Sequence, residues 1–152
     1  MPLHQYAYFA LFSRHTSADD MTSQLGITPD EVAVRGSRFT EPAVVPVDHA
    51  WMVVCRDPGL RVDEQITRIL DRLQPHTERV CALAAHLAST GGGAVLNVVR
   101  YFNDIEHAQQ GVADTPNLFG WHLDRRILDF LRATGVELGI DEYDMAEKED
   151  AR

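Results

Sequence analysis

Apolar and polar positions along the chain recur with two different periods, and the shorter period marks the strands. Segments 6–13 and 94–102 carry apolar residues on both faces, which is typical of central strands. Segments 31–39 and 49–56 alternate over shorter runs, and each leads into a turn. In segment 136–141 apolar residues alternate with Glu137, Gly139 and Asp141, which predicts a strand with one wet face.

The longer period, with apolar residues at helical spacing, predicts the helices. The first helix is expected to begin at the N-cap Ser17 and to end at Gly26. Two successive helices follow segment 49–56, and Pro75 is expected as the first residue of the second. Asp124 caps a final helix that ends at Gly135.

This order of elements predicts an α+β fold with a mainly antiparallel sheet and helices packed on one face. The first elements follow the βαββαβ order of ferredoxin-like domains, and a C-terminal helix and strand are added to it. Residues 1–144 are expected to form a single domain, with 103–119 as a long polar loop and 145–152 as an acidic mobile tail. The expected core comprises Phe9, Leu11, Trp51, Val53, Leu70, Leu83, Leu96, Val98, Leu128 and Ile140.

Composition narrows the functional classes. The chain has 152 residues, and 23 Asp and Glu against 14 Lys and Arg give a net charge of −9. A field of that sign repels nucleic acid and suits a basic protein partner. No apolar stretch is long enough to span a bilayer and no secretory signal is seen at the start, so we expect a cytoplasmic protein without membrane contact.

A set of short motifs links the chain to a known family. They are Leu25-Gly26-Ile27 followed by Pro29, the Arg35-Gly36 turn, Trp51, and Gly135 followed by Asp141-Glu142-Tyr143. Through these motifs the chain resembles the bacterial family known as domain of unknown function 4279, over Tyr6 to Asp144. The resemblance implies an α+β domain with no established activity and no catalytic residues to transfer.

The residues that could carry catalysis or bind metal occur in incomplete sets. His122 and Asp124 could share a face, but a metal site needs a third converging ligand, and Asp124 is better explained as a helix cap. The triplet Gly91-Gly92-Gly93 leaves a helix instead of leading into one, which does not fit a phosphate loop. We therefore expect no metal, no cofactor and no catalytic residues.

The remaining candidates are Arg35, Trp51, Asp141 and Tyr143, which the resemblance groups as a set. Trp, Tyr and Arg dominate binding hot spots, so the four residues could form a recognition patch. Alternatively Trp51 packs in the core and Arg35 pairs with Asp141 to fix the edge of the sheet.

The leading hypothesis is a non-enzymatic binding or protein-interaction domain, for example one with an immunity-type role. The alternative is a small-molecule-binding domain or an enzyme with a pocket between the sheet and the helices. Perturbed titratable groups in a cleft would favour the enzyme. The sequence is compatible with a homodimer and does not set the oligomeric state.

Overall fold

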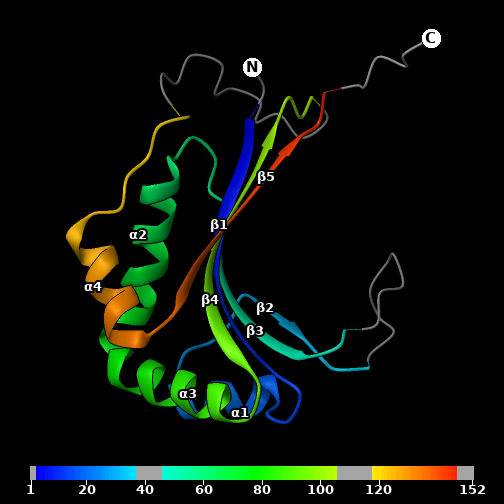
Figure 1. The fold of residues 1–152 in the computed structure, drawn as a ribbon, viewed down its shortest axis with the longest axis vertical. Coiled ribbons are helices and arrows are strands. Elements are labelled where there is room, and N and C mark those ends of the chain that lie inside the picture. The colour runs from blue at the N-terminus through cyan, green and yellow to red at the C-terminus, as the bar shows by residue number, and fades with distance from the viewer. Residues whose placement is uncertain (1–2, 37–45, 106–117, 147–152) are drawn as a thin grey trace.

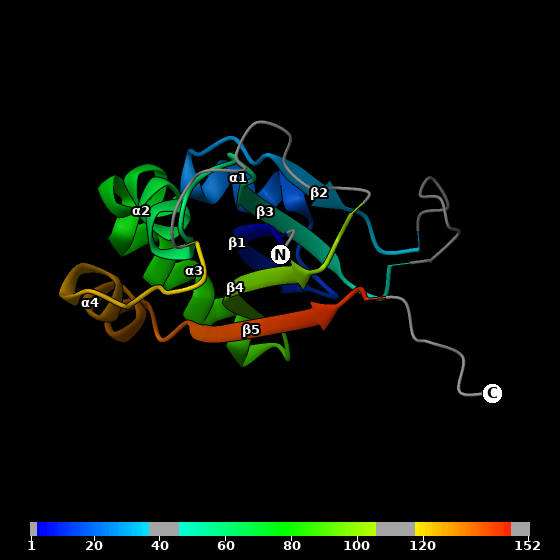
Figure 2. The same ribbon diagram turned by 90° about the horizontal axis from the view of Figure 1, so that it is seen from above.

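The computed structural model describes residues 3–36, 46–105 and 118–146, and in this part of the chain it has an α+β fold (Figure 1). A five-stranded sheet has the order β2-β3-β1-β4-β5. Figure 2 shows β2 and β5 at its two opposite edges. The strands are β1 (Leu3–Ser13), β2 (Glu31–Ala33), β3 (His49–Cys55), β4 (Gly93–Phe102) and β5 (Glu137–Asp144).

Four α-helices lie in the described residues, all on one side of the sheet: α1 (Ala18–Leu25), α2 (Val62–Leu73), α3 (Thr77–Ser89) and α4 (Arg125–Thr134). Ser17 caps α1 by accepting a hydrogen bond from the Asp20 amide, and Asp124 caps α4 in the same way. Gly26 and Gly135 end these helices in the left-handed conformation, as expected. Pro75 lies in a short 3-10 helix (Gln74–His76) between α2 and α3.

Most of the sheet is antiparallel. β1 pairs antiparallel with both β3 and β4, β2 pairs antiparallel with β3, and only β5 runs parallel to its neighbour β4. The predicted α+β class, the mainly antiparallel sheet and the helices on one face are confirmed. The five-strand order differs from that of a four-stranded ferredoxin-like sheet, because β5 is added outside β4.

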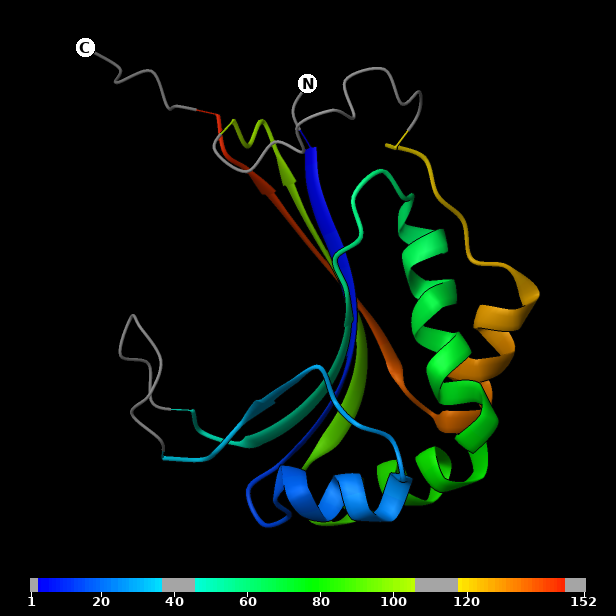
Figure 3. The same cartoon turned by 180° about the vertical axis from the view of Figure 1, so that it is seen from behind.

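Alternation along the central strand β1 separates the core from the opposite face. Phe9 and Leu11 point to the helices and are fully buried, with Trp51, Leu70 and Leu96 among their neighbours in the core. The sheet curves so that its other face is concave and turned away from the helices (Figure 3). None of the described helices covers that face.

Two of the predicted core residues are wrong, and parts of three predicted segments lie outside the residues that the structure describes. Leu128 and Ile140 are not core residues, since 50% and 47% of their surface is exposed. Leu128 lies on the outer face of α4, whose buried residues are Ile127, Phe130 and Thr134, and Ile140 stands on the edge strand. Segment 31–39 runs as predicted from a strand, which ends at Ala33, into a turn at Arg35 and Gly36, and 37–39 lie outside the described residues. The ranges 106–117 and 147–152, in the predicted loop and tail, lie outside the described residues.

No helix in the described part of the chain combines the length and the apolar character needed to cross a membrane.

Candidate functional site

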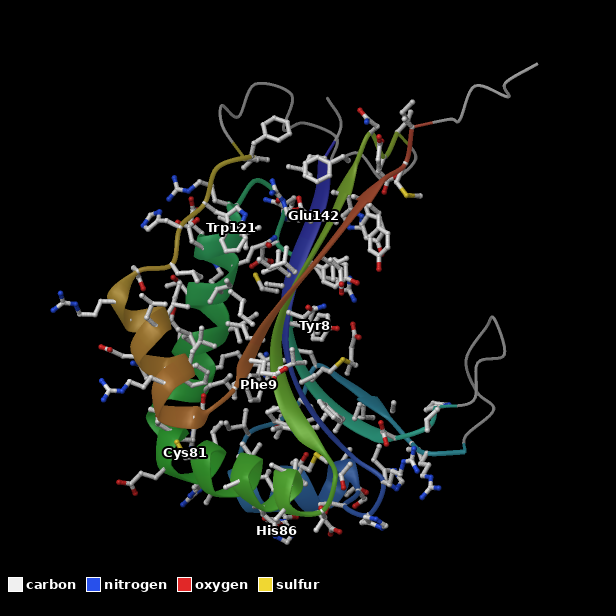
Figure 4. The ribbon with its side chains drawn as sticks, in the orientation of Figure 1. Tyr8, Phe9, Cys81, His86, Trp121 and Glu142 are labelled. Carbon is white, nitrogen blue, oxygen red and sulfur yellow. The ribbon has the colours of Figure 1, made fainter. Side chains whose placement is uncertain are left out.

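The open face of the sheet carries a group of aromatic side chains. Tyr6 and Tyr8 alternate with the core residues of β1, so their rings stand on the side away from the helices. Figure 4 shows Tyr8 pointing to the open side and Phe9 pointing to the helices. Cross-strand pairing adds Tyr101 of β4 opposite His4, and Tyr143 of β5 beside Tyr101.

Three of these rings form a row across three strands. His4 stacks on Tyr101 with centroids 5.5 Å apart, and Tyr101 stacks on Tyr143 with centroids 5.2 Å apart. Tyr6 lies 6.1 Å from His4 and stacks on Tyr8 at 6.2 Å. We call these five residues the aromatic face. Aromatic contacts of this kind hold the rings in place.

A buried amide connects the aromatic face to the sheet edge. The Asn97 side chain on β4 is only 6% exposed and donates hydrogen bonds to Tyr8 Oη (3.0 Å) and to Asp141 Oδ2 (2.9 Å). Its neighbour on β5 is Gly139, where a Cβ atom would lie 2.2 Å from Asn97 Oδ1. The absence of a side chain at Gly139 therefore allows Asn97 to hold Tyr8 and Asp141 together.

One cation already lies on this face. The guanidinium of Arg56 is 4.2 Å from the centroid of the Tyr6 ring, and its Nη2 donates to Glu31 Oε1 at 3.0 Å. Burial lowers the pKa of Arg56, but the hydrogen bonds and charges of Glu31 and Tyr6 together outweigh burial, so the pKa lies above its ordinary value. An arginine held between a tyrosine ring and a carboxylate is thus compatible with this surface.

The hydroxyls of Tyr8 and Tyr101 resist ionisation. Burial raises the pKa of Tyr8 above its ordinary value, and the hydrogen bond from Asn97 opposes this only in part. Burial also raises the pKa of Tyr101, with a contribution from nearby Tyr6. Both hydroxyls remain protonated at neutral pH, where they can donate and accept hydrogen bonds.

On the helix side, one end of the interface between sheet and helices is polar. Arg100 is buried and donates to Gln5 Oε1 (3.1 Å) and to the Phe119 carbonyl (3.1 Å), and its Nη1 lies 3.5 Å from Glu142 Oε2. Burial lowers the pKa of Arg100, although Glu142 opposes the shift. Gln65 is also buried, and its Oε1 accepts no hydrogen bond from the described residues.

A surface depression of about 270 Å³ lies between β3 and α2. Three arginines line it, but each pairs with a carboxylate: Arg56 with Glu31, Arg68 with Asp57, and Arg72 with Asp30. Because these positive charges are neutralised within the protein, the depression does not have the character of an anion site.

The four residues predicted as a patch do not come together. Trp51 is fully buried on the helix side, where its Nε1 donates to Thr22 Oγ1 at 3.0 Å. Arg35 follows β2 at one edge of the sheet, and its Nη1 donates to the Arg14 carbonyl at 3.4 Å. Asp141 and Tyr143 lie on β5 at the opposite edge, so Arg35 cannot pair with Asp141. Whether any of the four binds a partner stays a prediction.

Asp141 and Tyr143 do belong to the open face, and the sequence interpretation missed the residues around them. His4, Tyr6 and Tyr8 occupy alternate positions of β1, and tyrosine suits a surface that is apolar and partly wet. That alternation separates the aromatic residues of β1 from its core residues, but it does not show that no described helix covers them. His122 contacts Asp63 at 3.2 Å, and Asp124 caps α4. Within 3–36, 46–105 and 118–146, no three His, Cys, Asp or Glu side chains converge as metal ligands.

Comparison with known proteins identifies the family of the chain. A family model described as domain of unknown function (DUF4279) matches residues 3–145, nearly the whole chain. No curated protein sequence and no solved structure matches the chain.

Proposed function

Since this chain belongs to the DUF4279 family, whose description assigns no activity, we propose its function from its own geometry. It is a non-enzymatic interaction domain that binds a basic protein partner on the aromatic face of the sheet. The observation that carries the proposal is the ordered group of five rings on a sheet face that no described helix covers.

The composition of the face supports a protein partner. A sheet face that no helix covers is expected to be mainly polar, whereas this one carries five aromatic rings, of which Tyr143 is exposed and the other four are partly exposed. An accessible aromatic group of this kind marks an interaction site. Tyrosine offers a large contact area with little loss of side-chain entropy, and it is enriched at binding hot spots.

Charge supports a basic partner. The net charge of −9 attracts cations over a distance, and Asp141 lies on the same face as the rings. Arg56 above Tyr6 is an example, within this protein, of how an arginine is held there. An immunity-type protein that neutralises a basic enzyme would use such a surface, and we keep the cytoplasm as the proposed location.

The test is capture of partners from cell extract with the full chain immobilised. We expect Tyr101→Ala, which removes the middle ring of the row, to weaken capture of basic proteins by about 2 kcal/mol, or roughly thirtyfold. Leu128→Ala, an apolar truncation on the far side of α4, is the matched control and should leave capture unchanged. Equal capture by wild type and both variants would refute the proposal.

A second candidate is a small polar ligand at the Arg100 end of the interface between sheet and helices. It is favoured by the buried Gln65 Oε1, which lacks a donor among the described residues. Gln65→Leu would abolish ligand-induced thermal stabilisation if such a ligand binds there, whereas Tyr101→Ala would not.

We also propose a ferredoxin-like arrangement for the part of the fold from β1 to β4. The strands β1 and β2, joined through α1, are both antiparallel to β3 between them. In the same way β3 and β4 lie on either side of β1. Two such split connections support this arrangement, with α4 and β5 as an extension. A solved structure with another strand order would contradict it.

A further inference from the structure

The two edges of the sheet differ in how well they are protected. At one edge, β2 has only three residues, and short edge strands are a common protection against pairing with other chains. At the other edge, β5 has eight residues and pairs with β4 on one side only. Among the described residues, no backbone group bonds to the outer side of β5. Within the described part of the chain, its outer N–H and C=O groups therefore form an open hydrogen-bonding edge.

Most of the usual protections are absent from β5. Its sequence contains no proline and no lysine, and its register with β4 runs without a bulge from Glu137 to Asp144. Its charged side chains are all negative: Glu137, Asp141, Glu142 and Asp144. A second copy of β5 would place carboxylates against carboxylates, which is unfavourable, whereas a basic strand would be complementary.

The aromatic row ends at this edge. Tyr143 stacks on Tyr101 with one face of its ring. The opposite face of the ring is turned away from β4, toward the outer side of the edge strand β5. A strand added beside β5 would place one of its side chains next to that outer face. An arginine in this position would stack on Tyr143 near the Asp141 carboxylate, as Arg56 stacks on Tyr6 near Glu31.

We propose that β5 receives an extended, basic segment of the partner by strand addition, with an arginine of that segment stacked on Tyr143. This inference rests on the proposed function and specifies how the partner binds: main-chain hydrogen bonds to β5 supply affinity, and carboxylates and the tyrosine select basic side chains.

The probe is a short peptide with blocked termini in which arginine and valine alternate. It is added to the full chain labelled with ¹⁵N, and amide exchange and affinity are measured. We expect slower exchange of β5 amides in the complex. N-methylation of alternate peptide residues should weaken binding about tenfold or more, because it removes donors from the added strand. A peptide with glutamate in place of arginine should not bind.

Two protein variants with the same charge change locate the contact. Glu137→Lys on β5 should weaken peptide binding, and Glu78→Lys on α3 should not. Tyr143→Ala should remove the preference for arginine over lysine in the peptide.

The outcomes separate the two proposals. Peptide binding that shifts the Tyr6 and Tyr8 signals without protecting β5 amides overturns strand addition and leaves the aromatic face as the site. Protection of β5 amides, combined with partner capture that Tyr101→Ala does not affect, supports strand addition and overturns the proposed role of the face. A basic peptide that does not bind at all overturns strand addition, and the capture experiment then decides on the face.

Discussion

At the scale of single residues, the pair Asn97 and Gly139 determines the shape of the open face. Asn97 is a polar residue buried on a sheet face, and it is satisfied because Tyr8 and Asp141 both accept from it. The space for this arrangement exists only because position 139 has no Cβ atom. A glycine in a strand normally weakens it, so its presence here has a packing reason.

We predict that Gly139→Ala lowers the free energy of unfolding by about 1–3 kcal/mol, since the new methyl group displaces the Asn97 amide from its partners. Urea denaturation measures the loss. In an Asn97→Ala background the same substitution should cost much less, because the clash is gone. Strictly additive losses would show that the two residues are not coupled.

Tyr8 makes stability depend on pH at the alkaline end. Its pKa is raised in the folded state, mainly by burial, so the folded protein holds this proton more tightly than the unfolded chain. The stabilisation is present below the unfolded pKa of about 10 and is lost as the pH rises through the folded pKa. We predict that the free energy of unfolding falls above about pH 10, and falls less steeply in Tyr8→Phe. Identical slopes for the two proteins would contradict this.

At the scale of elements, the sequence predicts where α4 begins and ends, but it does not predict which face of the helix is buried. The ends of the helix at Asp124 and Gly135 could be predicted because capping depends on local chemistry. The buried face could not, because Ile127, Leu128, Phe130 and Leu131 allow two overlapping apolar stripes. Packing selects Ile127, Phe130 and Thr134, and leaves Leu128 exposed. Periodicity gives the existence of a helix more reliably than its orientation.

A pair of truncations on α4 tests this orientation. Phe130→Ala should cost about 3–5 kcal/mol, because Phe130 is buried and packs edge-on against Phe9 at 6.2 Å. Leu128→Ala should stay within about 0.5 kcal/mol of wild type, as expected for a surface position. Thermal or urea unfolding of both variants gives the comparison, and a larger loss for Leu128→Ala would reverse the assigned face.

The aromatic face could not be predicted, because the apolar pattern of a strand does not show which of its two faces is covered by helices. Segment 6–13 is apolar on both sides, and a doubly buried strand has the same pattern as a strand with one uncovered aromatic face. Only the position of the helices, all on one side, decides between them. Alternation within β1 was visible in the sequence, but the absence of a covering layer was not.

At the scale of the whole molecule, strand order decides which distant residues can meet. The sequence pattern places Arg35 and Asp141 near the ends of two predicted strands, which suggested a pair. In the structure β2 and β5 are the two outermost strands, and Asp141 lies in the middle of β5. Nothing local in the sequence encodes this separation. The fold class was predictable from the sequence of elements, whereas the site depended on which strands become neighbours.

The net charge is a property of the whole chain, and it predicts how the rate of association with a basic partner depends on salt. With a charge of −9, association with a basic protein should be fastest at low salt and should slow as screening shortens the range of attraction. Stopped-flow association rates between about 0.05 and 0.5 M salt test this. Dissociation rates should change less, because they depend on the close contacts of the aromatic face. An association rate independent of salt would argue against a basic partner.

The position of β5 at the outer side of β4 also matters during protein synthesis. β4 is almost entirely apolar, and until β5 docks it is itself the edge of the sheet. Roughly forty residues separate the end of β4 from the end of β5, so a ribosome working at about 5–20 residues per second completes β5 roughly 2–8 s later. During those seconds the nascent chain offers a long, mostly apolar edge without carboxylates to other chains. The arrival of β5 replaces that edge with one rich in carboxylates, and the newly made protein then repels its own copies.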